Sequence, residues 1–100
     1  MARIELAPEL TDDFDRIVDH LLAHEAPDAA SRLRDIIGAI DILGENPLIG
    51  RLLAADLREL VIGRRAHGYV ALYRYVEEVD TVFVLAIRAQ KESGYGRDLP

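Results

Sequence analysis

The stretch YVALYRYVEEVDTVFVLAIR, residues 69–88, decides the fold of this 100-residue chain. It contains two runs rich in β-branched and aromatic residues, Tyr69–Glu77 and Thr81–Arg88, and such runs are typical of β-strands. The acidic turn Glu78-Val79-Asp80 between them is short, which predicts that the two strands pair antiparallel. Because the second run is apolar until Arg88, we expect it in the middle of the sheet, covered on both faces.

Two further extended segments lie upstream of this stretch. Leu57–Ile62 is a strand candidate that ends at Gly63, and Arg3–Leu6 is a short one that ends before Pro8. The connections between Leu57–Ile62, Tyr69–Glu77 and Thr81–Arg88 are short and polar, so we expect these three strands to form an antiparallel meander. Alternate residues of the Tyr69–Glu77 run, the tyrosines 69, 73 and 75, share one face. They form either a core face, which we favour, or a platform for stacking bases.

Between the first and second extended segments, apolar residues recur at spacings of three and four, which is typical of amphipathic helices. The first helix is expected to follow Pro8 and to end near Glu25, and the second to open at Pro27-Asp28 and to stop at Gly44. The first helix carries charged residues that we place off its apolar stripe: Asp12, Asp13, Asp15, Arg16 and Asp19.

The order of these segments predicts an α+β domain of the form β-α-α-β-β-β. An N-terminal strand and an antiparallel helical hairpin would pack on one face of a small antiparallel sheet. The chain has the length of one domain, and neither an internal repeat nor a linker interrupts it, so residues 1–100 are treated as a single domain.

Composition excludes several classes of protein. The chain has no cysteine, so it has neither disulfides nor a cysteine-ligated metal site. No stretch approaches the roughly 20 apolar residues that a membrane span needs. The N-terminal residues lack the apolar core of a signal peptide, and we therefore expect a cytoplasmic protein without a membrane partner.

The charge is uneven along the chain. The net charge is −6 and the isoelectric point is about 4.9, which makes the protein a poor general binder of nucleic acid. However, residues 1–50 hold four arginines against eleven acidic residues, whereas residues 51–100 hold eight cations against seven. A local basic site on the sheet half therefore stays open, beside the plainer interpretation of solvated surface charge.

Standard catalytic motifs are missing from the sequence. His20 and His24 are four residues apart on the first helix, but no third ligand follows at a metal-binding spacing, so we expect no metal. The serines, Ser31 and Ser93, lack a glycine-flanked elbow, and no glycine-rich loop precedes a helix. We therefore expect no cofactor.

What remains is a set of cationic and hydrogen-bonding side chains on and after the predicted strands. These residues are Arg58, Arg64, Arg65, His67, Arg74, Arg88, Lys91 and Tyr95. Cleavage of RNA without a metal needs a base, an acid and cations that stabilise the phosphorane, and side chains of these types can provide all three.

The sequence resembles the RelE/ParE superfamily of toxins from type II toxin–antitoxin modules. The resemblance is carried by Leu57–Ile62, by Gly68–Tyr75, and by Val82–Arg88 with the following Gln90-Lys91-Glu92. The connection Asn46–Arg51 also fits that superfamily, and the resemblance extends from residue 4 to about residue 95. It implies the same helical hairpin on a small antiparallel sheet.

The resemblance leaves two activities open, because the superfamily contains two functional classes. RelE-like members are metal-independent endoribonucleases that cut mRNA on the ribosome, whereas ParE-like members inhibit DNA gyrase by binding it. Where RelE-like enzymes place a catalytic arginine this chain has Val70, and Leu60-Val61-Ile62 replaces their lysine pattern. We therefore favour a ParE-like, non-enzymatic toxin of a plasmid-stabilisation type. A RelE-like ribonuclease using Arg64, Arg65, Arg88 and Tyr95 is the alternative, and an inactive interaction module is a third.

Either toxin interpretation implies a cognate ParD-like antitoxin that binds this chain in a hetero-oligomer. We expect its charge contacts among the sheet arginines and its apolar contacts on the helical hairpin. The residues concerned are Arg58, Arg64, Arg65, Arg74 and Arg88 on the sheet, and Leu21, Leu22, Ile36 and Ile37 on the helices.

Overall fold

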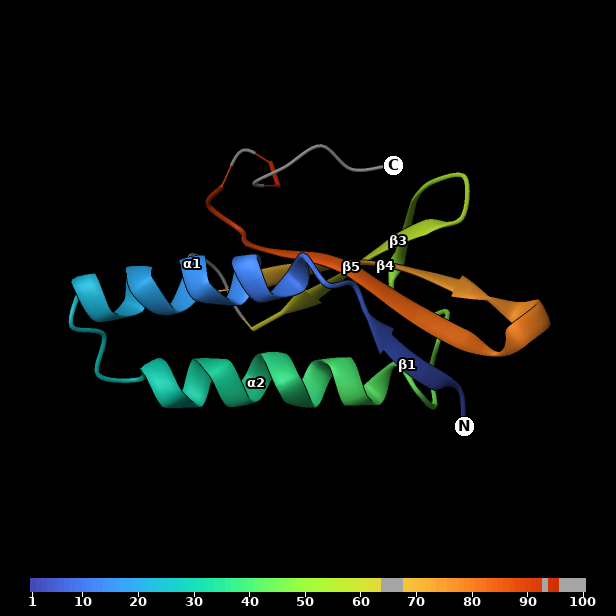
Figure 1. Ribbon diagram of the computed structural model, residues 1–100, viewed down its shortest axis with the longest axis horizontal. Helices are drawn as coiled ribbons and strands as arrows, with labels where there is room; N and C mark the ends of the chain where they lie inside the picture. The colour runs from blue at the N-terminus through green and yellow to red at the C-terminus, as the bar shows by residue number, and fades with distance from the viewer. Residues whose placement is uncertain (64–67, 93, 96–100) are drawn as a thin grey trace.

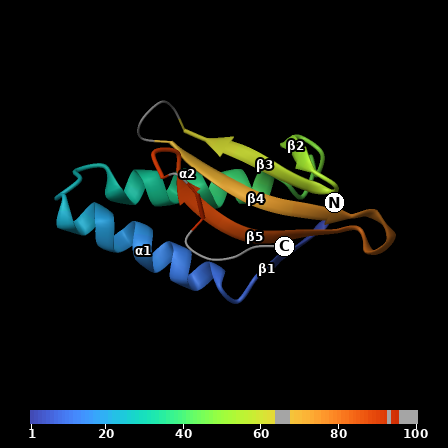
Figure 2. The ribbon, with the colours of Figure 1, turned by 90° about the horizontal axis from the view of Figure 1, so that it is seen from above.

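A computed structural model of the protein describes residues 1–63, 68–92 and 94–95. Two helices cover one face of a five-stranded sheet with the strand order β1-β5-β4-β3-β2 (Figures 1 and 2). The elements are β1 (Arg3–Leu6), α1 (Leu10–Ala23), α2 (Ala29–Ile42), β2 (Arg51–Ala54), β3 (Leu57–Ile62), β4 (Tyr69–Val76), the 3-10 turn η2 (Glu77–Val79) and β5 (Thr81–Ala89). The predicted α+β class is confirmed.

The sheet is mixed rather than wholly antiparallel. Strands β2 to β5 form the expected antiparallel series, but β1 pairs parallel with β5, from Arg3 opposite Thr81 to Leu6 opposite Val84. The predicted antiparallel meander did not include this parallel pairing of β1 with β5. The pattern of a strand indicates which of its faces is buried but not which strand lies beside it, so the partner of β1 was not predictable.

Strand β2 was also missed, because we expected only a turn-rich connection before Leu57. It pairs with β3 through a tight turn in which Ala55 has a φ of 50°. Glycine or asparagine is usual in this left-handed conformation, and their presence is the normal sequence signal for a hairpin. Ala55-Asp56 provides no such signal.

The tyrosines of β4 lie in the core between the sheet and the helices. Tyr69 and Tyr73 are buried and Tyr75 packs partly against the same cluster, so the predicted core face is confirmed. The hydroxyl of Tyr73 accepts the N–H of Gly50 at 2.8 Å, and burial raises the pKa of that hydroxyl above its ordinary value. This bond ties the start of β2 to the centre of the sheet.

The helices bury one side each, with one exception to the expected pattern. Leu10, Ile17 and Leu21 of α1 are buried, but Asp13 is buried as well, with only 1% of its surface exposed. The placement of Asp13 off the apolar stripe was therefore wrong, and its partners in β5 are described below. Neither helix in the described part of the chain is long and apolar enough to span a membrane.

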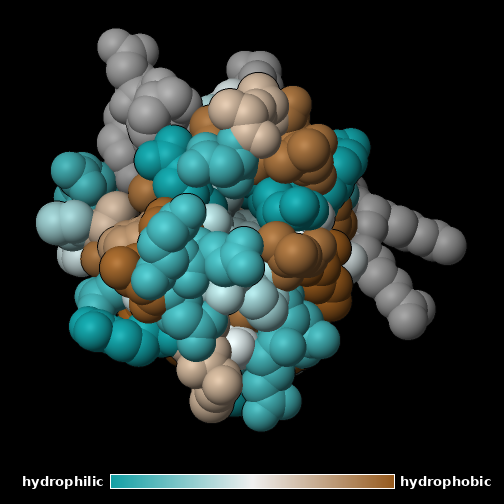
Figure 3. All heavy atoms as spheres, turned by 90° about the vertical axis from the view of Figure 1, so that its right-hand side faces the viewer, coloured by the Kyte–Doolittle hydropathy of each residue, from teal (hydrophilic) through white to brown (hydrophobic). Residues whose placement is uncertain are grey.

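The two edges of the sheet differ in character. On the β1 edge, the exposed Arg3 and Glu5 form an ion pair of 2.6 Å, and charged edge residues discourage pairing with another strand. On the other edge every residue of β2 is exposed, including Leu52 and Leu53, and the preceding Leu48 and Ile49 are more than half exposed. Figure 3, which views the end with the β4–β5 turn, shows hydrophobic patches between hydrophilic ones.

Two glycine-to-alanine substitutions test this packing with opposite expected signs. A Cβ atom on Gly50 would lie 2.6 Å from the Tyr73 ring and hydroxyl and 2.9 Å from the Glu59 carbonyl oxygen. We expect Gly50→Ala to lower the free energy of unfolding by about 1–3 kcal/mol. A Cβ on Gly38, inside α2, meets nothing within 4 Å, so Gly38→Ala should raise it by about 0.5–1 kcal/mol. Urea unfolding of both variants measures the difference, and equal effects would contradict the described packing.

Candidate functional site on the outer face of the sheet

The face of the sheet that points away from the helices carries a small second core. The strand register places Glu59 opposite Leu72, and Leu72 opposite Ala86. Leu72 and Ala86 form a buried cluster with Leu57, against which Leu85 and Tyr95 pack. Tyr95, which follows β5, thus covers part of the outer face. This face is the candidate site because it unites the late arginine and the tyrosine predicted from the sequence.

A buried carboxylate lies on this face, on strand β3. The side chain of Glu59 is 5% exposed; one oxygen accepts the Tyr95 hydroxyl at 2.8 Å and the other pairs with Arg51 at 2.8 Å. Arg88 lies 3.9 Å from the oxygen that Tyr95 contacts. Burial alone raises the pKa of Glu59, but the bonds from Tyr95 and Arg51 and the charges of Arg88 and Arg51 outweigh it and lower the pKa below its ordinary value.

Tyr95 is held from two sides. Its hydroxyl donates to Glu59, and the Arg88 guanidinium lies over its ring, 5.3 Å from the centroid, in a cation–π contact. Burial, followed by the hydrogen bond to Glu59, raises the pKa of this hydroxyl well above its ordinary value. The hydroxyl therefore stays protonated and is a poor proton acceptor at neutral pH.

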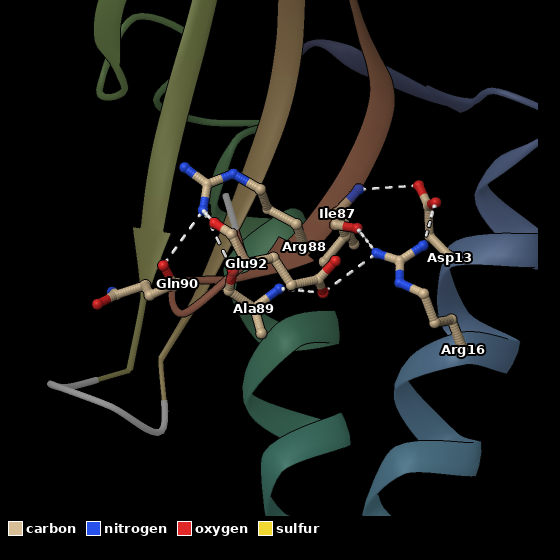
Figure 4. Close-up of polar contacts among 7 residues, drawn as sticks. All are labelled: Asp13, Arg16, Ile87, Arg88, Ala89, Gln90 and Glu92. Carbon is tan, nitrogen blue, oxygen red and sulfur yellow. Dashed lines mark hydrogen bonds and ion pairs between the residues drawn. The ribbon is translucent and has the colours of Figure 1, made fainter. Parts of the chain in front are cut away.

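Arg88 also orders the turn that follows β5. Its Nη1 donates to the carbonyl oxygens of Ala89, Gln90 and Glu92 at 3.1, 3.4 and 3.1 Å (Figure 4). An arginine that ends an apolar strand needs such partners, because an unpaired buried charge is costly. The Arg88 guanidinium therefore donates hydrogen bonds to the turn with Nη1, while its Nη2 faces the Glu59 carboxylate.

Side chains of α1 complete the backbone of β5 where β1 no longer pairs with it. The last register pair of β1 and β5 is Leu6 with Val84, so the N–H and C=O of Ile87 lie beyond that strand. Asp13 accepts the Ile87 N–H at 3.0 Å, and Arg16 donates to the Ile87 carbonyl oxygen at 3.1 Å (Figure 4). Arg16 also contacts Asp13 at 3.1 Å and Glu92 at 3.4 Å. Asp13 and Arg16 thus satisfy the backbone groups that a neighbouring strand would otherwise satisfy. Their spacing of three residues along α1 was the only sequence signal that they act together.

The other predicted site residues are distributed over several places. Arg64, Arg65 and His67 lie outside the described residues. Arg58 lies on the helix side of the sheet, opposite Tyr73 in register, and donates to the carbonyl oxygens of Leu48 and Gly50 at 3.3 and 2.9 Å. Arg74 shares the outer face with Leu57 and pairs with Asp56 at 3.1 Å.

The four antitoxin-contact residues predicted on the helical hairpin differ in how far they are exposed. Leu21 and Ile36 are core residues, with 2% and 0% of their surface exposed, because they face the sheet. Leu22 and Ile37 are 67% and 55% exposed. Only this second pair offers apolar surface to a partner in the described conformation.

The histidine pair does not form a metal site with its described surroundings. His20 and His24 are exposed, with ring centroids 4.2 Å apart, and the His24 Nδ1 lies 2.9 Å from the His20 carbonyl oxygen. Among residues 1–63, 68–92 and 94–95, no group of three potential ligands lies close enough to hold a metal ion.

Comparison with known proteins agrees with this architecture. A family model described as the ParE toxin of the type II toxin–antitoxin system parDE matches residues 4–94. The chain belongs to the ParE toxin family. Toxin RelE3 of Caulobacter vibrioides is 34% identical over 93 residues, which cover 92% of this chain and 98% of that toxin. The present chain is therefore a RelE/ParE superfamily toxin of the type II toxin–antitoxin class.

A solved structure shares the fold of this ParE-family toxin. The structure described as the chromosomal ParDE TA system from P. aeruginosa superposes with a TM-score of 0.71 at 22% identity. The match covers 89% of this chain and 96% of that one. At this identity the likeness concerns the arrangement of helices and strands.

Substitution of Asp13 tests the link between α1 and β5. Asp13→Ala leaves the Ile87 N–H and part of the Arg16 guanidinium without an acceptor, and we expect it to lower the free energy of unfolding by about 1–3 kcal/mol. Asp12 is the matched control, because it is exposed on the same helical turn, and Asp12→Ala should change stability by less than about 0.5 kcal/mol. Equal losses in denaturant unfolding of the two variants would refute the role of Asp13.

Glu59 should make stability depend on pH in the acid range. Because its folded pKa is lowered, its contribution is full above the unfolded value of about 4.3 and is lost as the pH falls through the folded value. Glu59→Gln should therefore cost about 1–3 kcal/mol at neutral pH and less below about pH 4. Urea unfolding over this range measures the change. Glu77→Gln, at an exposed carboxylate, is the control and should change stability at neutral pH by less than about 0.5 kcal/mol.

Proposed function

We propose that this toxin acts by binding and not by catalysis: it inhibits DNA gyrase, and a cognate ParD-like antitoxin neutralises it in a hetero-oligomer. The observation that carries the proposal is the buried Glu59 carboxylate, which is bonded to Tyr95 and Arg51 and lies 3.9 Å from Arg88. This contact occupies Arg88 and Tyr95, two of the four side chains that the ribonuclease alternative would direct at RNA.

Electrostatics on the outer face opposes the chemistry of RNA cleavage. Arg88 would have to stabilise the negative charge of a phosphorane, but Glu59 already offsets part of its charge. Tyr95 would have to exchange a proton near neutral pH, but its hydroxyl pKa is raised and its proton is donated to Glu59. The Glu59 carboxylate beside Arg88 also repels a phosphate group.

The ribonuclease alternative has one favourable observation, namely that Arg88 and Tyr95 lie together on the outer face. It also agrees with the name of the relative Toxin RelE3. On that alternative, mRNA on the ribosome is the target and Arg64 and Arg65 complete the site. A chain with neither activity would be an inactive interaction module.

The antitoxin part of the proposal is supported by the family and by the P. aeruginosa structure of the same fold, which is described as a ParDE system. We propose that this antitoxin contacts Arg74 and Arg88 with acidic groups and covers the exposed Leu22 and Ile37. The further contacts that we predicted at Arg58, Arg64 and Arg65 belong to the same hypothesis.

Two assays on the toxin, purified free of antitoxin, separate these functions. We expect loss of gyrase supercoiling activity as the toxin approaches the molar amount of gyrase, and intact mRNA in a purified translation system. Addition of the antitoxin should restore supercoiling. Cleaved mRNA with unaffected gyrase would replace the proposal by the ribonuclease alternative, and no effect in either assay would favour the inactive module.

Tyr95→Phe tests the role of the hydroxyl within the same assays. The ring and its contact with Arg88 remain, so we expect unchanged gyrase inhibition and a loss of about 1 kcal/mol in stability from the missing bond to Glu59. Removal of a group that transfers a proton would instead lower activity by about 10²-fold or more. Such a loss of toxicity in a folded variant would contradict a binding mechanism.

A further inference from the structure

The sheet ends at β2 with a strand whose second side is open. Strand β2 pairs with β3 and is the last in the order β1-β5-β4-β3-β2, so within the described part of the chain no strand lies on its other side (Figure 2). The backbone N–H and C=O groups that point away from β3 can pair with another extended chain. We call β2 and the two exposed apolar residues that precede it, Leu48 and Ile49, the β2 edge.

The β2 edge lacks the protection that the β1 edge has. Charged side chains, proline or a covering element usually keep an exposed edge strand from pairing with another chain. Strand β2 has the sequence RLLA, and its single charged residue, Arg51, is bonded to Glu59 at 2.8 Å. Leu52 and Leu53 are more than half exposed, like Leu48 and Ile49. The β2 edge therefore combines open backbone groups with uncovered apolar side chains.

The charges around the β2 edge permit contact between two identical chains. Residues 46–62 hold two arginines and two acidic residues, a net charge of zero in a chain of −6, and the eleven acidic residues of the first half all precede this segment. Both acidic residues of the segment are paired, Glu59 with Arg51 and Asp56 with Arg74. Two copies that meet here bring together neutral surfaces and keep their acidic residues elsewhere, so like-charge repulsion is small.

A two-fold axis perpendicular to the sheet fits the pattern of side chains. Two antiparallel strands related by this axis keep the same faces together, so the residue on the axis lies opposite its own copy. Leu52 suits this position, because it is in register with Arg58 of β3, whereas Leu53 falls in the register shift and has no partner in β3. With Leu52 on the axis, Arg51 lies opposite Leu53 of the second copy, and its aliphatic stem can cover that leucine.

We propose that the β2 edge binds a second copy of this chain, in an antiparallel pair that joins the two sheets into one. This inference goes beyond the proposed function and depends on neither gyrase nor the antitoxin. The axis places both outer faces on the same side of the joined sheet. Glu59 lies opposite Arg51 on the adjacent strand β3, so three strand spacings of about 4.8 Å separate the two copies of Glu59 and put them roughly 15 Å apart.

Sedimentation of the toxin, purified free of antitoxin, tests the pairing. Because β2 is four residues long, the interface is small, and we expect a monomer–dimer equilibrium in the micromolar range with a limiting mass twice the 11.2 kDa of one chain. Leu52→Lys puts two like charges on the axis and should weaken the dimer at least about tenfold. Val79→Lys, at an exposed apolar residue of η2, is the matched control and should leave the dimer unchanged. Urea unfolding verifies that both variants are folded.

Cross-linking tests the register of the two strands. The chain has no cysteine, so Leu52→Cys introduces a single thiol, which the axis places opposite its own copy. Cβ atoms of directly opposed residues lie about 5 Å apart, which is within reach of a disulfide after a small adjustment. We expect oxidation to convert most of this variant to a covalent dimer, while Val79→Cys stays largely monomeric under the same conditions.

The outcomes separate this inference from the proposed function. A toxin that is still monomeric at about 1 mM would overturn it, as would a dimer that Leu52→Lys leaves intact. A monomeric toxin whose affinity for the antitoxin falls with Leu52→Lys would show that an antitoxin strand, and not a second copy, occupies the β2 edge. A dimeric toxin that leaves gyrase unaffected would contradict the proposed function and support the inference drawn here.

Discussion

The structure depends on how the backbone of β5 is satisfied beyond the end of β1. Strand β1 is only four residues long and accompanies β5 as far as Val84. Buried backbone groups without partners are costly, so the remaining part of β5 needs other donors and acceptors. Asp13 and Arg16 provide them at Ile87 from α1. The helix layer is thereby joined to the sheet by directional bonds as well as by apolar contact.

Side chains on the two faces of β5 connect this backbone arrangement with the candidate site. Toward the helices, Arg16 contacts Glu92 in the turn that follows β5. On the outer face, Arg88 is shared between the turn and Glu59, which also binds Tyr95. One scaffold can support different activities, because function depends on the side chains that the scaffold brings together. Here a carboxylate meets the late arginine and tyrosine, and the proposed binding mechanism is argued from this contact.

Local patterns predicted most of the elements. Leu57–Ile62 was predicted with its observed bounds, and β4, β5 and both helices within a few residues, because apolar periodicity and the glycine and proline positions are local signals. The partner of β1 was not predictable, since pairing across most of the chain leaves no local trace. Asp13 was missed because an aspartate is ordinarily a surface residue and its acceptor role depends on where β1 ends. The role of Glu59 was missed as well, because the positions of Tyr95 and Arg51 relative to it arise only from the tertiary fold.

The parallel pairing of β1 with β5 has a consequence for the order of events during synthesis. In this sheet the first strand in chain order has the fifth as its neighbour, from Arg3 with Thr81 to Leu6 with Val84. Such non-local pairing forms slowly and cannot begin before both partners are present. A growing chain therefore holds its helical hairpin without the strand that α1 covers. The outer face, where Glu59 meets Arg88 and Tyr95, therefore forms only after β5 and the turn that follows it have been made.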